Sequence, residues 1–528
     1  MDESQAPDGP DSGQAASGKR GLLRSSGIVS SMTLVSRVLG LARDVVIARY
    51  FGAGPATDAF FVAFKIPNFL RRLFAEGAFN QAFVPVLAEF RQQRGQGAVR
   101  DLVGAVAGSL GLVLLVVTAL AVAGSPALTA LFAPGFIGDG SRFELASDML
   151  RLTFPYLLLI SLTAFAGGIL NTYNRFAVPA FTPVLLNIAM IGAAIGLAPY
   201  MTEPVMALAW GVLIAGLLQF LFQLPFLLQL GLLPRPRVDY RHEGVVRIMK
   251  LMLPALFGVS VSQINLLLDT VLASFLQAGS VSWLYYSDRL SELPLGVFGV
   301  AIGTVILPNL SKKHADQAPE HFARTLDWAV RMVLVIGLPA ALALALIAEP
   351  VLATLFHYGE VTERDIIMSA MSLRAYAFGL VAFMLVKVLA PGFFARQDTA
   401  TPVRIAVIAM VSNMVFNLIL VFPLAHAGLA LATALSAWMN AGLLWRGLRK
   451  ENAYQAAPGW GRFALQLLLA NGVMGGAILW YADTAGSWLA GGVFDKVTHM
   501  AILVALGGGL YFATLFATGV RIRHFRAH

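Results

Sequence analysis

The chain has 528 residues, of which 58% are hydrophobic and only 13% are charged, and its mean hydropathy is +0.73. These values lie well outside the range of soluble globular proteins and indicate a polytopic membrane protein. The chain contains no cysteine, which excludes disulfides, thiolate zinc sites and iron–sulfur clusters. Its net charge is +9, but the basic residues are scattered over short loops, so nucleic acid is not expected as a partner.

The N-terminal segment is polar and lacks the apolar stretch of a signal peptide, so we expect residues 1–24 to form a disordered cytoplasmic tail. Apolar runs of span length then recur almost to the C-terminus. They predict an all-α fold of about fourteen transmembrane helices, at residues 27–51, 57–91, 102–124, 146–171, 178–199, 205–231, 245–275, 281–311, 325–347, 366–395, 402–422, 427–448, 462–482 and 498–520.

The distribution of Lys and Arg over the loops predicts the orientation. Cytoplasmic loops retain positive charge, whereas translocated loops do not. With the N-terminus in the cytoplasm, almost all loop Lys and Arg fall on the cytoplasmic side, and only Arg142, Arg364 and Lys496 fall on the other. The even number of spans then places the C-terminus in the cytoplasm as well.

The first two predicted spans contain charged residues that are costly in a membrane and therefore mark a cavity or a transport path. They hold six cations against three anions: Arg37, Arg43, Asp44, Arg49, Asp58, Lys65, Arg71, Arg72 and Glu76. Asp58, Lys65 and Arg72 are spaced by seven residues and share a helix face, with Asn68 beside them. Some of these charges can pair as buried structural contacts, but the surplus of cations predicts a cavity that binds an anion.

An internal repeat predicts the architecture. At an offset of 223 residues, 58–90 aligns with 281–313, and Arg151 aligns with Arg374. An even number of helices per repeat preserves orientation, so we expect two six-helix lobes related by an axis along the membrane normal. The predicted domains are the tail (1–24), an N-lobe (25–233), a C-lobe (234–450), and two additional helices with the cytoplasmic C-terminus (451–528).

The predicted C-lobe carries polar residues of its own. Asp288 and Arg289 lie within one helical turn of Glu292. A second set combines a carboxylate, two amides and a hydroxyl, which together could bind Na⁺ through oxygen ligands: Asp269, Asn413, Asn417 and Thr433. Ordinary hydrogen bonds between helices are the competing interpretation of this set. Proton coupling through Asp269 also remains open.

Five segments closely resemble the MurJ (MviN) family of bacterial lipid II flippases, within the MOP exporter superfamily. They are residues 36–44, 56–68, 70–79, 281–290 and 386–398. The resemblance runs from about Ser25 to the C-terminus. It implies a protein of the bacterial inner membrane that moves the undecaprenyl-diphosphate-linked peptidoglycan precursor from the cytoplasmic to the periplasmic leaflet. It also implies that the last two helices form an apolar groove leading to the cavity.

The resemblance gives functional weight to the arginines at 37, 43, 71 and 289 and to Asp44. Together with the spacing, it defines the predicted substrate-binding set: Arg37, Arg43, Asp44, Asp58, Lys65, Asn68, Arg71, Arg72, Glu76, Asp288, Arg289, Glu292 and Lys387. The expected partners are lipid II, membrane lipid and proteins of cell-wall synthesis. We expect no catalytic residues and no cofactor, with Na⁺, H⁺ or the membrane potential as the energy source.

Three alternatives stand beside this interpretation. A multidrug or polysaccharide-lipid exporter of the same superfamily would share the repeat but should lack the charged signature of the first two helices. A membrane enzyme acting on polyprenyl diphosphate would need acid-rich metal motifs, and the sequence contains no pair of the DDxxD type. A nontransporting scaffold that recruits cell-wall enzymes would retain its function when the cavity arginines are neutralised.

Overall fold

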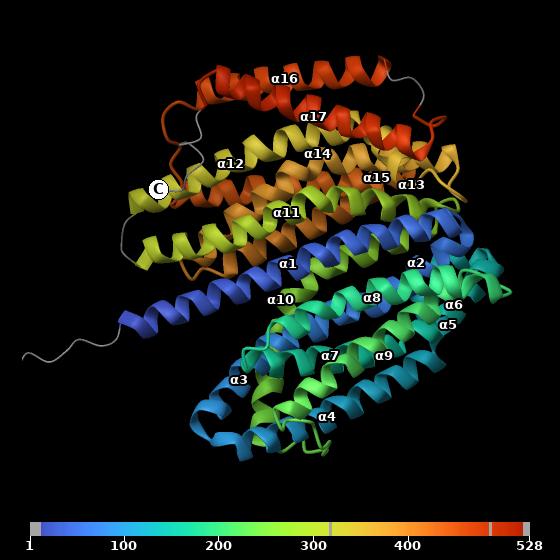
Figure 1. Ribbon diagram of the computed structural model, residues 1–528, viewed down its shortest axis with the longest axis vertical. Helices are drawn as coiled ribbons and strands as arrows, with labels where there is room; N and C mark the ends of the chain where they lie inside the picture. The colour runs from blue at the N-terminus through green and yellow to red at the C-terminus, as the bar shows by residue number, and fades with distance from the viewer. Residues whose placement is uncertain (1–11, 316–318, 485–487, 521–528) are drawn as a thin grey trace, which may run out of the picture. The chain divides into compact units, whose positions relative to one another are not determined.

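The computed structural model describes residues 12–315, 319–484 and 488–520, and these residues form helices and connecting turns without an assigned strand. This confirms the predicted all-α fold. Figure 1 shows the helices as long rods joined by short turns. In the first half of the chain they are α1 (Ser12–Phe51), α2 (Pro55–Leu70), a π-helix (Arg71–Phe79), α3 (Asn80–Gln93), α4 (Gly95–Ala123), α5 (Ser125–Phe132), α6 (Gly140–Thr153), α7 (Pro155–Thr172), α8 (Ala177–Gly196) and α9 (Met206–Gln229), with short 3₁₀ turns at Pro134–Gly138 and Ala198–Tyr200.

The second half of the chain also consists of helices joined by short connections. Its helices are α10 (Glu243–Ser274), α11 (Ser280–Ala315), α12 (Pro319–Leu346), α13 (Ala348–Phe356), α14 (Glu363–Phe394), α15 (Ala400–Lys450), α16 (Trp460–Thr484) and α17 (Val493–Ala517). Each of the fourteen predicted spans lies almost wholly within helical segments, although α1 begins well before its predicted span and α15 contains two of the spans.

Nine helices of the described residues are long and apolar enough to cross a membrane. They lie in α4, α6–α7, α8, α9, α12, α14, α15, α16 and α17. The five other predicted spans comprise those in α1, α2–α3, α10 and α11, together with the second of two that α15 contains. The number of fourteen crossings therefore stays a prediction, whereas a multi-pass membrane protein is well supported.

One prediction needs correction at the N-terminus. α1 begins at Ser12, so residues 12–24 are helical rather than part of a disordered tail. This segment contains Gln14, Ala15, Ala16, Leu22 and Leu23, which are good helix formers and extend the helix beyond the apolar run. Residues 1–11 lie outside the described residues.

The helix bounds confirm the 223-residue repeat. Shifted by 223, the bounds of α4 become 318–346, and α12 spans 319–346. In the same way α5 becomes 348–355 and α6–α7 becomes 363–395, against 348–356 for α13 and 363–394 for α14. The short helices α5 and α13, which the hydropathy pattern did not single out, thus belong to the repeat as well.

The two halves depart from the repeat at two places. The π-helix at Arg71–Phe79 corresponds to 294–302, which is regular α-helix within α11. The loop between α8 and α9 corresponds to a sharp break inside α15, where Ala425 has φ 47° and ψ −128°. This region of backbone space is disfavoured for residues with a Cβ. Both departures mark places where one half of the chain is locally strained or irregular.

The contacts divide the chain into two compact units. The first contains residues 1–43, 70–123 and 152–256, and the second contains 44–69, 124–151 and 257–528. This division cuts α1 between Arg43 and Asp44 and separates α2 from the π-helix. The predicted lobe boundaries, which follow the repeat, stay a prediction.

The core of the first unit lies where α3, α4 and α7 meet. The rings of Phe79 and Phe83 stack with their centroids 5.2 Å apart, and Phe83 lies 5.1 Å from Phe165. A Cβ on Gly168 of α7 would come within 3.1 Å of the Phe83 ring, so the ring would have to shift slightly to admit any larger residue. Burial of these large aromatic side chains stabilises the unit.

The second unit has one apolar core among α12, α14 and α15 and another where α16 and α17 pack on α12. Figure 1 shows α16 and α17 side by side. The hydroxyl of Tyr511 in α17 donates a 2.6 Å hydrogen bond to the carbonyl of Val335 in α12. The two helices outside the repeat are therefore fastened to the second unit by polar as well as apolar contacts.

Candidate functional site

The structure brings three predicted site residues of the second unit together between α1 and α11. Asp44 of α1 is buried, and its Oδ2 lies 3.7 Å from Nε of Arg289 in α11. Nη1 of Arg289 donates a 3.0 Å hydrogen bond to Glu292 one turn along the helix. Tyr285, one turn before Arg289, donates from its hydroxyl to Oδ1 of Asp44 at 2.9 Å.

The Arg289 guanidinium is only partly neutralised by hydrogen bonds. Its side chain is 31% exposed, and its Nε has no acceptor within hydrogen-bond distance among the described residues. The separation of 3.7 Å from Asp44 allows attraction between the charges but is too long for a hydrogen bond. Nε is also buried, so an anion could reach this donor only after the side chains around it move.

The group formed by Asp44, Arg289 and Glu292 has no excess of positive charge, because it contains two carboxylates and one guanidinium. The six cations of the first two predicted spans lie on α1, α2 and the π-helix: Arg37, Arg43, Arg49, Lys65, Arg71 and Arg72. Any anion bound by Arg289 consequently competes with Asp44 and Glu292 for the same donors.

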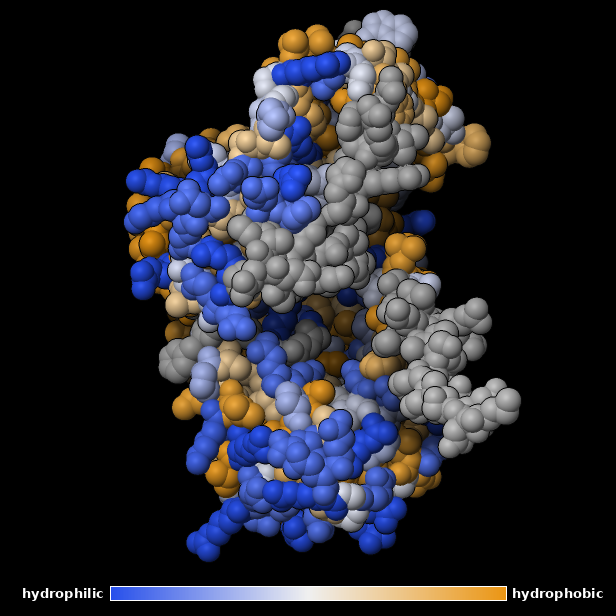
Figure 2. All heavy atoms as spheres, turned by 90° about the vertical axis from the view of Figure 1, so that its left-hand side faces the viewer, coloured by the Kyte–Doolittle hydropathy of each residue, from blue (hydrophilic) through white to orange (hydrophobic). Residues whose placement is uncertain are grey.

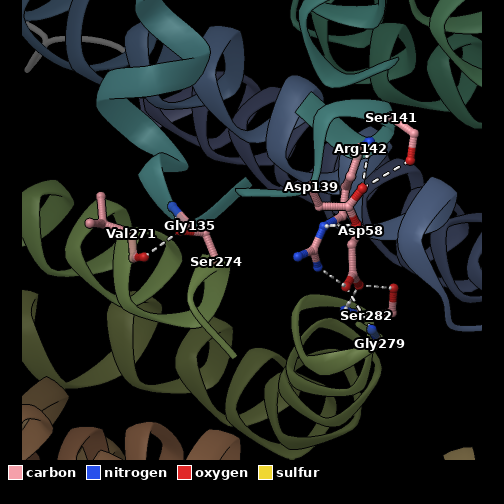
Figure 3. A network of polar contacts seen from close by, with 9 residues as sticks. All are labelled: Asp58, Gly135, Asp139, Ser141, Arg142, Val271, Ser274, Gly279 and Ser282. Atoms are coloured by element: carbon pink, nitrogen blue, oxygen red, sulfur yellow. Dashed lines mark hydrogen bonds and ion pairs between the residues drawn. The ribbon is translucent and has the colours of Figure 1, made fainter. Parts of the chain in front are cut away.

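Asp58 plays a different part, as Figure 3 shows. It is fully buried, and its carboxylate accepts hydrogen bonds from the backbone N–H of Gly279 at 2.7 Å and from the N–H and hydroxyl of Ser282 at 2.9 and 2.7 Å. These donors lie at the N-terminus of α11, where unpaired N–H groups favour a negative charge. Arg142 adds a weaker ion pair at 3.9 Å. The arrangement anchors the start of α2 to the start of α11.

Gly135 makes a separate contact within the second unit, also drawn in Figure 3. Its N–H donates to Oγ of Ser274 at the end of α10, and a Cβ at this position would lie 2.3 Å from the Ser274 carbonyl oxygen. A glycine is thus required where the segment after α5 crosses the end of α10. Asp139 completes the network with a 3.4 Å contact to Arg142.

Arg43 is the best-defined site residue of the first unit. It is buried, and its Nη1 donates a 3.1 Å hydrogen bond to Oδ1 of Asn187 in α8. The amide nitrogen of Asn187 donates in turn to the carbonyl of Ser36 at 3.0 Å. This amide is neutral, so it orients the guanidinium without neutralising its charge. Arg37, a turn and a half earlier on α1, is exposed.

The π-helix displays Arg71 and Arg72, which are both half-buried. A π-helix adds a residue to the turn and shifts the direction of the side chains that follow, and such segments often occur at functional sites. Lys65 and Asn68 are half-buried on the preceding α2. The side chain of Glu76 lies outside the described residues.

The four residues predicted to bind a cation are brought together between α10 and α15. The Nδ2 of Asn417 donates to Oδ1 of Asp269 at 2.7 Å, and the hydroxyl of Thr433 lies 3.4 Å from Oδ2. Asn413 is buried beside them and interacts weakly with Asp269. Among the described residues, its amide atoms and Oδ1 of Asn417 make no hydrogen bond of normal geometry. Buried oxygens without donors fit a hard cation such as Na⁺.

The remaining predicted residues are less informative. Lys65 is close enough to Asp269 to interact electrostatically with it. Asp288 is half-buried next to Arg289, and Lys387 is exposed on α14. A cavity of about 480 Å³ in the first unit is lined by Arg91 and by residues of α3, α7 and the start of α8, and it contains none of the predicted site residues.

Comparison with known proteins identifies the family. A family model described as lipid II flippase MurJ matches residues 47–499. The chain belongs to the MurJ family. The probable lipid II flippase MurJ of Vibrio cholerae serotype O1 is 52% identical over 513 residues, which cover 96% of this chain and 98% of the relative.

Other relatives agree. The probable lipid II flippase MurJ of Haemophilus influenzae is 52% identical, covering 93% of this chain and 99% of its own length. The lipid II flippase MurJ of Burkholderia cenocepacia is 46% identical, with 96% and 99% coverage. Membership of the MurJ family thus extends over nearly the whole chain.

Among solved structures, lipid II flippase MurJ in an inward closed conformation matches with a TM-score of 0.76 and 26% identity, covering 92% of this chain and 97% of that one. An inward-facing MATE multidrug transporter of the MOP superfamily matches with a TM-score of 0.66 but only 16% identity, covering 81% and 98%. The second likeness reflects the shared fold, and the sequence likeness favours MurJ over the exporter alternative.

Two residues that contact the candidate site were not predicted from the sequence. Asn187 is a lone amide in an otherwise apolar span, and Tyr285 precedes Arg289 by four residues. The spacing of Tyr285 places it on the same helix face as Arg289 and could have indicated its position. The spacing within α11 could not have indicated its contact with α1.

Proposed function

We propose that this chain moves lipid II, the undecaprenyl-diphosphate-linked precursor of peptidoglycan, from the cytoplasmic to the periplasmic leaflet. The observation that carries the proposal is its membership of the MurJ family over almost the entire chain. We place the protein in the bacterial inner membrane, with both termini in the cytoplasm.

The chemistry of the substrate supports this function. Its head group carries a diphosphate, sugars and a peptide and cannot cross hydrocarbon unaided, whereas its polyprenyl tail can remain in the lipid. Arginine suits the diphosphate because its planar guanidinium can donate two parallel hydrogen bonds to phosphate oxygens. Arg43 has a neutral partner, the amide of Asn187, and Arg289 has an acidic one, Asp44. These partners orient the two guanidinium groups for such contacts.

The transport step requires no covalent chemistry. Arg37, Arg43 and Arg289 hold the diphosphate and the neighbouring part of the head group, and Arg71 and Arg72 assist. The two lobes of the repeat then alternate access to the two sides of the membrane. Asp58 contributes a structural joint, because its carboxylate accepts three hydrogen bonds that hold the start of α11 against α2, so these helix ends move together.

The orientation rests on charge. Exposed arginines gather around the α3–α4 turn and in the segment that leads into the first turns of α10, at Arg91, Arg94, Arg100, Arg235, Arg237, Arg241 and Arg247. Figure 2 shows hydrophilic side chains concentrated at this end of the first unit. Such an excess of Arg is typical of cytoplasmic loops. Arg94 is hydrogen-bonded to Glu243, and this contact lowers the pKa of that carboxyl.

Neutralising the site arginines tests the proposed function. Arg43→Ala or Arg289→Ala should each abolish complementation in cells depleted of the native protein, because each removes charged hydrogen bonds worth about 1.5–3 kcal/mol. Arg289→Lys should also lose activity, since an ammonium cannot donate two parallel bonds to phosphate. Membrane levels of all variants are measured by immunoblot.

Arg241→Ala provides the matched control, because Arg241 is exposed in the segment before α10 and lies outside the predicted site. This variant should complement fully. Full complementation by both Arg43→Ala and Arg289→Ala, at normal membrane levels, would exclude a role for these residues in holding the head group.

We further propose that the oxygen cluster of the second unit binds Na⁺ and couples it to transport. Asp269, Asn413, Asn417 and Thr433 would hold the ion, and two buried amide oxygens that accept no hydrogen bond of normal geometry support the fit. The amide of Asn417 can rotate by 180° and present its oxygen in place of its nitrogen. A bound Na⁺ would supply the positive charge that stabilises the buried carboxylate of Asp269.

A further inference from the structure

We propose that Tyr285 is a positioning residue that keeps Arg289 available to the substrate diphosphate. The inference rests on the proposed function and deepens it, because it assigns a role to a residue outside the charged signature. Tyr285 contacts both members of the Asp44–Arg289 pair, and it does so with different parts of its side chain.

The hydroxyl of Tyr285 restrains Asp44. It donates to Oδ1 of Asp44 at 2.9 Å, while Oδ2 remains 3.7 Å from Nε of Arg289. An Arg–carboxylate pair normally closes to two parallel hydrogen bonds of about 2.7–2.9 Å. A buried carboxylate that loses a donor is drawn to the guanidinium next to it, because burial without hydrogen bonds is costly. Tyr285 thus donates to Asp44 and prevents the pair from closing.

The ring of Tyr285 supports the guanidinium from one face. Cζ of Arg289 lies 4.8 Å from the ring centroid, a cation–π distance. A planar cation stacked on a ring keeps its edge N–H groups available for in-plane acceptors. Nε itself is buried and has no acceptor among the described residues, whereas 31% of the Arg289 side chain as a whole is exposed. The ring therefore fixes the plane in which phosphate oxygens are received.

Phe61 of α2 holds the ring itself in place. Its ring stacks on that of Tyr285 with centroids 3.9 Å apart and an interplanar angle of 21°. Phe61 is buried, and its neighbours include Tyr286, which meets it edge-on at 5.9 Å. Phe61, Tyr285 and Arg289 consequently form a stack that starts in the apolar interior of α2 and ends at a partly exposed guanidinium.

The adjacent tyrosine supplies a matched control. Tyr286 is buried, and its hydroxyl donates to the carbonyl of Gly52 at 2.8 Å. Tyr285→Phe and Tyr286→Phe each remove one hydroxyl from neighbouring positions of α11. Only the first of them removes a donor from Asp44, so only the first should affect substrate affinity.

The experiment measures binding of lipid II to purified protein in detergent, together with the thermal midpoint of each variant. Tyr285→Phe should weaken binding about ten-fold, because the freed carboxylate competes for Arg289. Tyr286→Phe should lower the thermal midpoint but leave the affinity within about two-fold. In an Asp44→Asn background, Tyr285→Phe should produce no further loss, since the competing charge is absent.

The outcomes of this experiment distinguish the proposed role of Tyr285 from the proposed head-group role of Arg289. Unchanged affinity in Tyr285→Phe, with weakened binding in Arg289→Ala, would overturn the role of Tyr285 and leave the head-group role of Arg289 intact. An equal loss in both tyrosine variants, or a full ten-fold loss in the Asp44→Asn background, would also overturn it. Unchanged affinity in Arg289→Ala would overturn both proposals.

Discussion

Two acidic residues of the charged signature differ in the kind of partner that they meet. The buried carboxylate of Asp58 accepts three hydrogen bonds at a helix N-terminus. Asp44 accepts a tyrosine hydroxyl on one oxygen and faces a partly exposed guanidinium at 3.7 Å with the other. Removing one member of a buried charged group costs about 3–5 kcal/mol, because the partner is left uncompensated. Asp58 therefore suits a structural joint, and Asp44 suits an exchangeable contact.

Asp269 provides a residue-scale test of ion coupling. Asp269→Asn removes the negative charge that would hold Na⁺ but preserves the size and much of the hydrogen bonding of the side chain. We expect the variant to lose any dependence of flipping on Na⁺ while its affinity for lipid II stays largely intact. The measurement is flipping by purified protein in liposomes, in sodium and in choline buffer.

Equal flipping rates in sodium and choline buffers for the native protein would show that Na⁺ is not coupled to transport. Thr163→Ala serves as the control, because Thr163 lies on α7 of the first unit and its hydroxyl donates to the carbonyl of Leu159 one turn earlier. This variant should retain the ion dependence of the native protein. The same dependence in Asp269→Asn would argue against this carboxylate as the ligand.

The charged residues of the candidate site stand out in the sequence because an ionisable group in an apolar span has few structural reasons to be there. Their neutral partners do not. Asn187 reaches Arg43 from a helix 144 residues away, and Tyr285 reaches Asp44 across 241 residues. Helix periodicity identifies a face but not the helix that it meets, so such contacts emerge only from the packed structure.

At the scale of elements, joints between helices depend on close backbone contacts. The N–H of Glu360 donates to the carbonyl of Arg49 at 3.0 Å, where the end of α1 meets the turn before α14. Gly52 and Gly359 both have φ of 64°, and a Cβ on Gly359 would lie 2.1 Å from the Arg49 carbonyl oxygen. Left-handed backbone and lack of space both require glycine here. This joint holds the end of α1 within the second unit.

A second joint, between α17 and the turn after α13, should respond to pH. Nζ of Lys496 lies 3.2 Å from Nδ1 of His357, above the ring of Tyr358, and the Lys496 side chain is buried. Burial and the neighbouring Lys496 lower the pKa of His357 below its ordinary 6.5, although Glu363 opposes the shift. A neutral imidazole can accept this hydrogen bond, whereas a protonated one repels the ammonium.

The sign of the effect follows from the lowered pKa. The stabilisation by this joint is present above about pH 6.5 and is lost as the pH falls through the lower pKa of the folded state. We expect the thermal midpoint of the purified protein to fall between pH 7 and pH 5, by less in His357→Gln, whose amide oxygen accepts without titrating. Parallel pH profiles for the two proteins would show that His357 does not control this joint.

The elements themselves were largely predictable, because hydropathy and span length identify membrane helices. The π-helix at Arg71–Phe79 was not, since its apolar and charged residues also fit a regular α-helix. The break at Ala425 was predicted only as a gap between two spans. The short helices α5 and α13 were not predicted, because eight or nine residues are too few to show a clear helical period of hydrophobicity.

At the scale of the whole molecule, the repeat organises the fold, and the departures from it indicate function. Helices α4 to α7 recur as α12 to α14 at a constant offset, so both halves follow one helical plan. The π-helix and most of the excess positive charge occur in the first half, whereas the oxygen cluster and Arg289 occur in the second. A repeated helical framework thus carries side chains that differ between its two halves.

The most direct test of the central claim is the leaflet distribution of lipid II in living cells. Cells depleted of this protein are treated with a membrane-impermeable reagent that reacts with or cleaves lipid II on the periplasmic side. We predict that the accessible fraction falls sharply on depletion, returns with the native protein, and stays low with Arg289→Ala at an equal membrane level. Accessible lipid II that remains unchanged after depletion would contradict the assignment of this protein as the flippase.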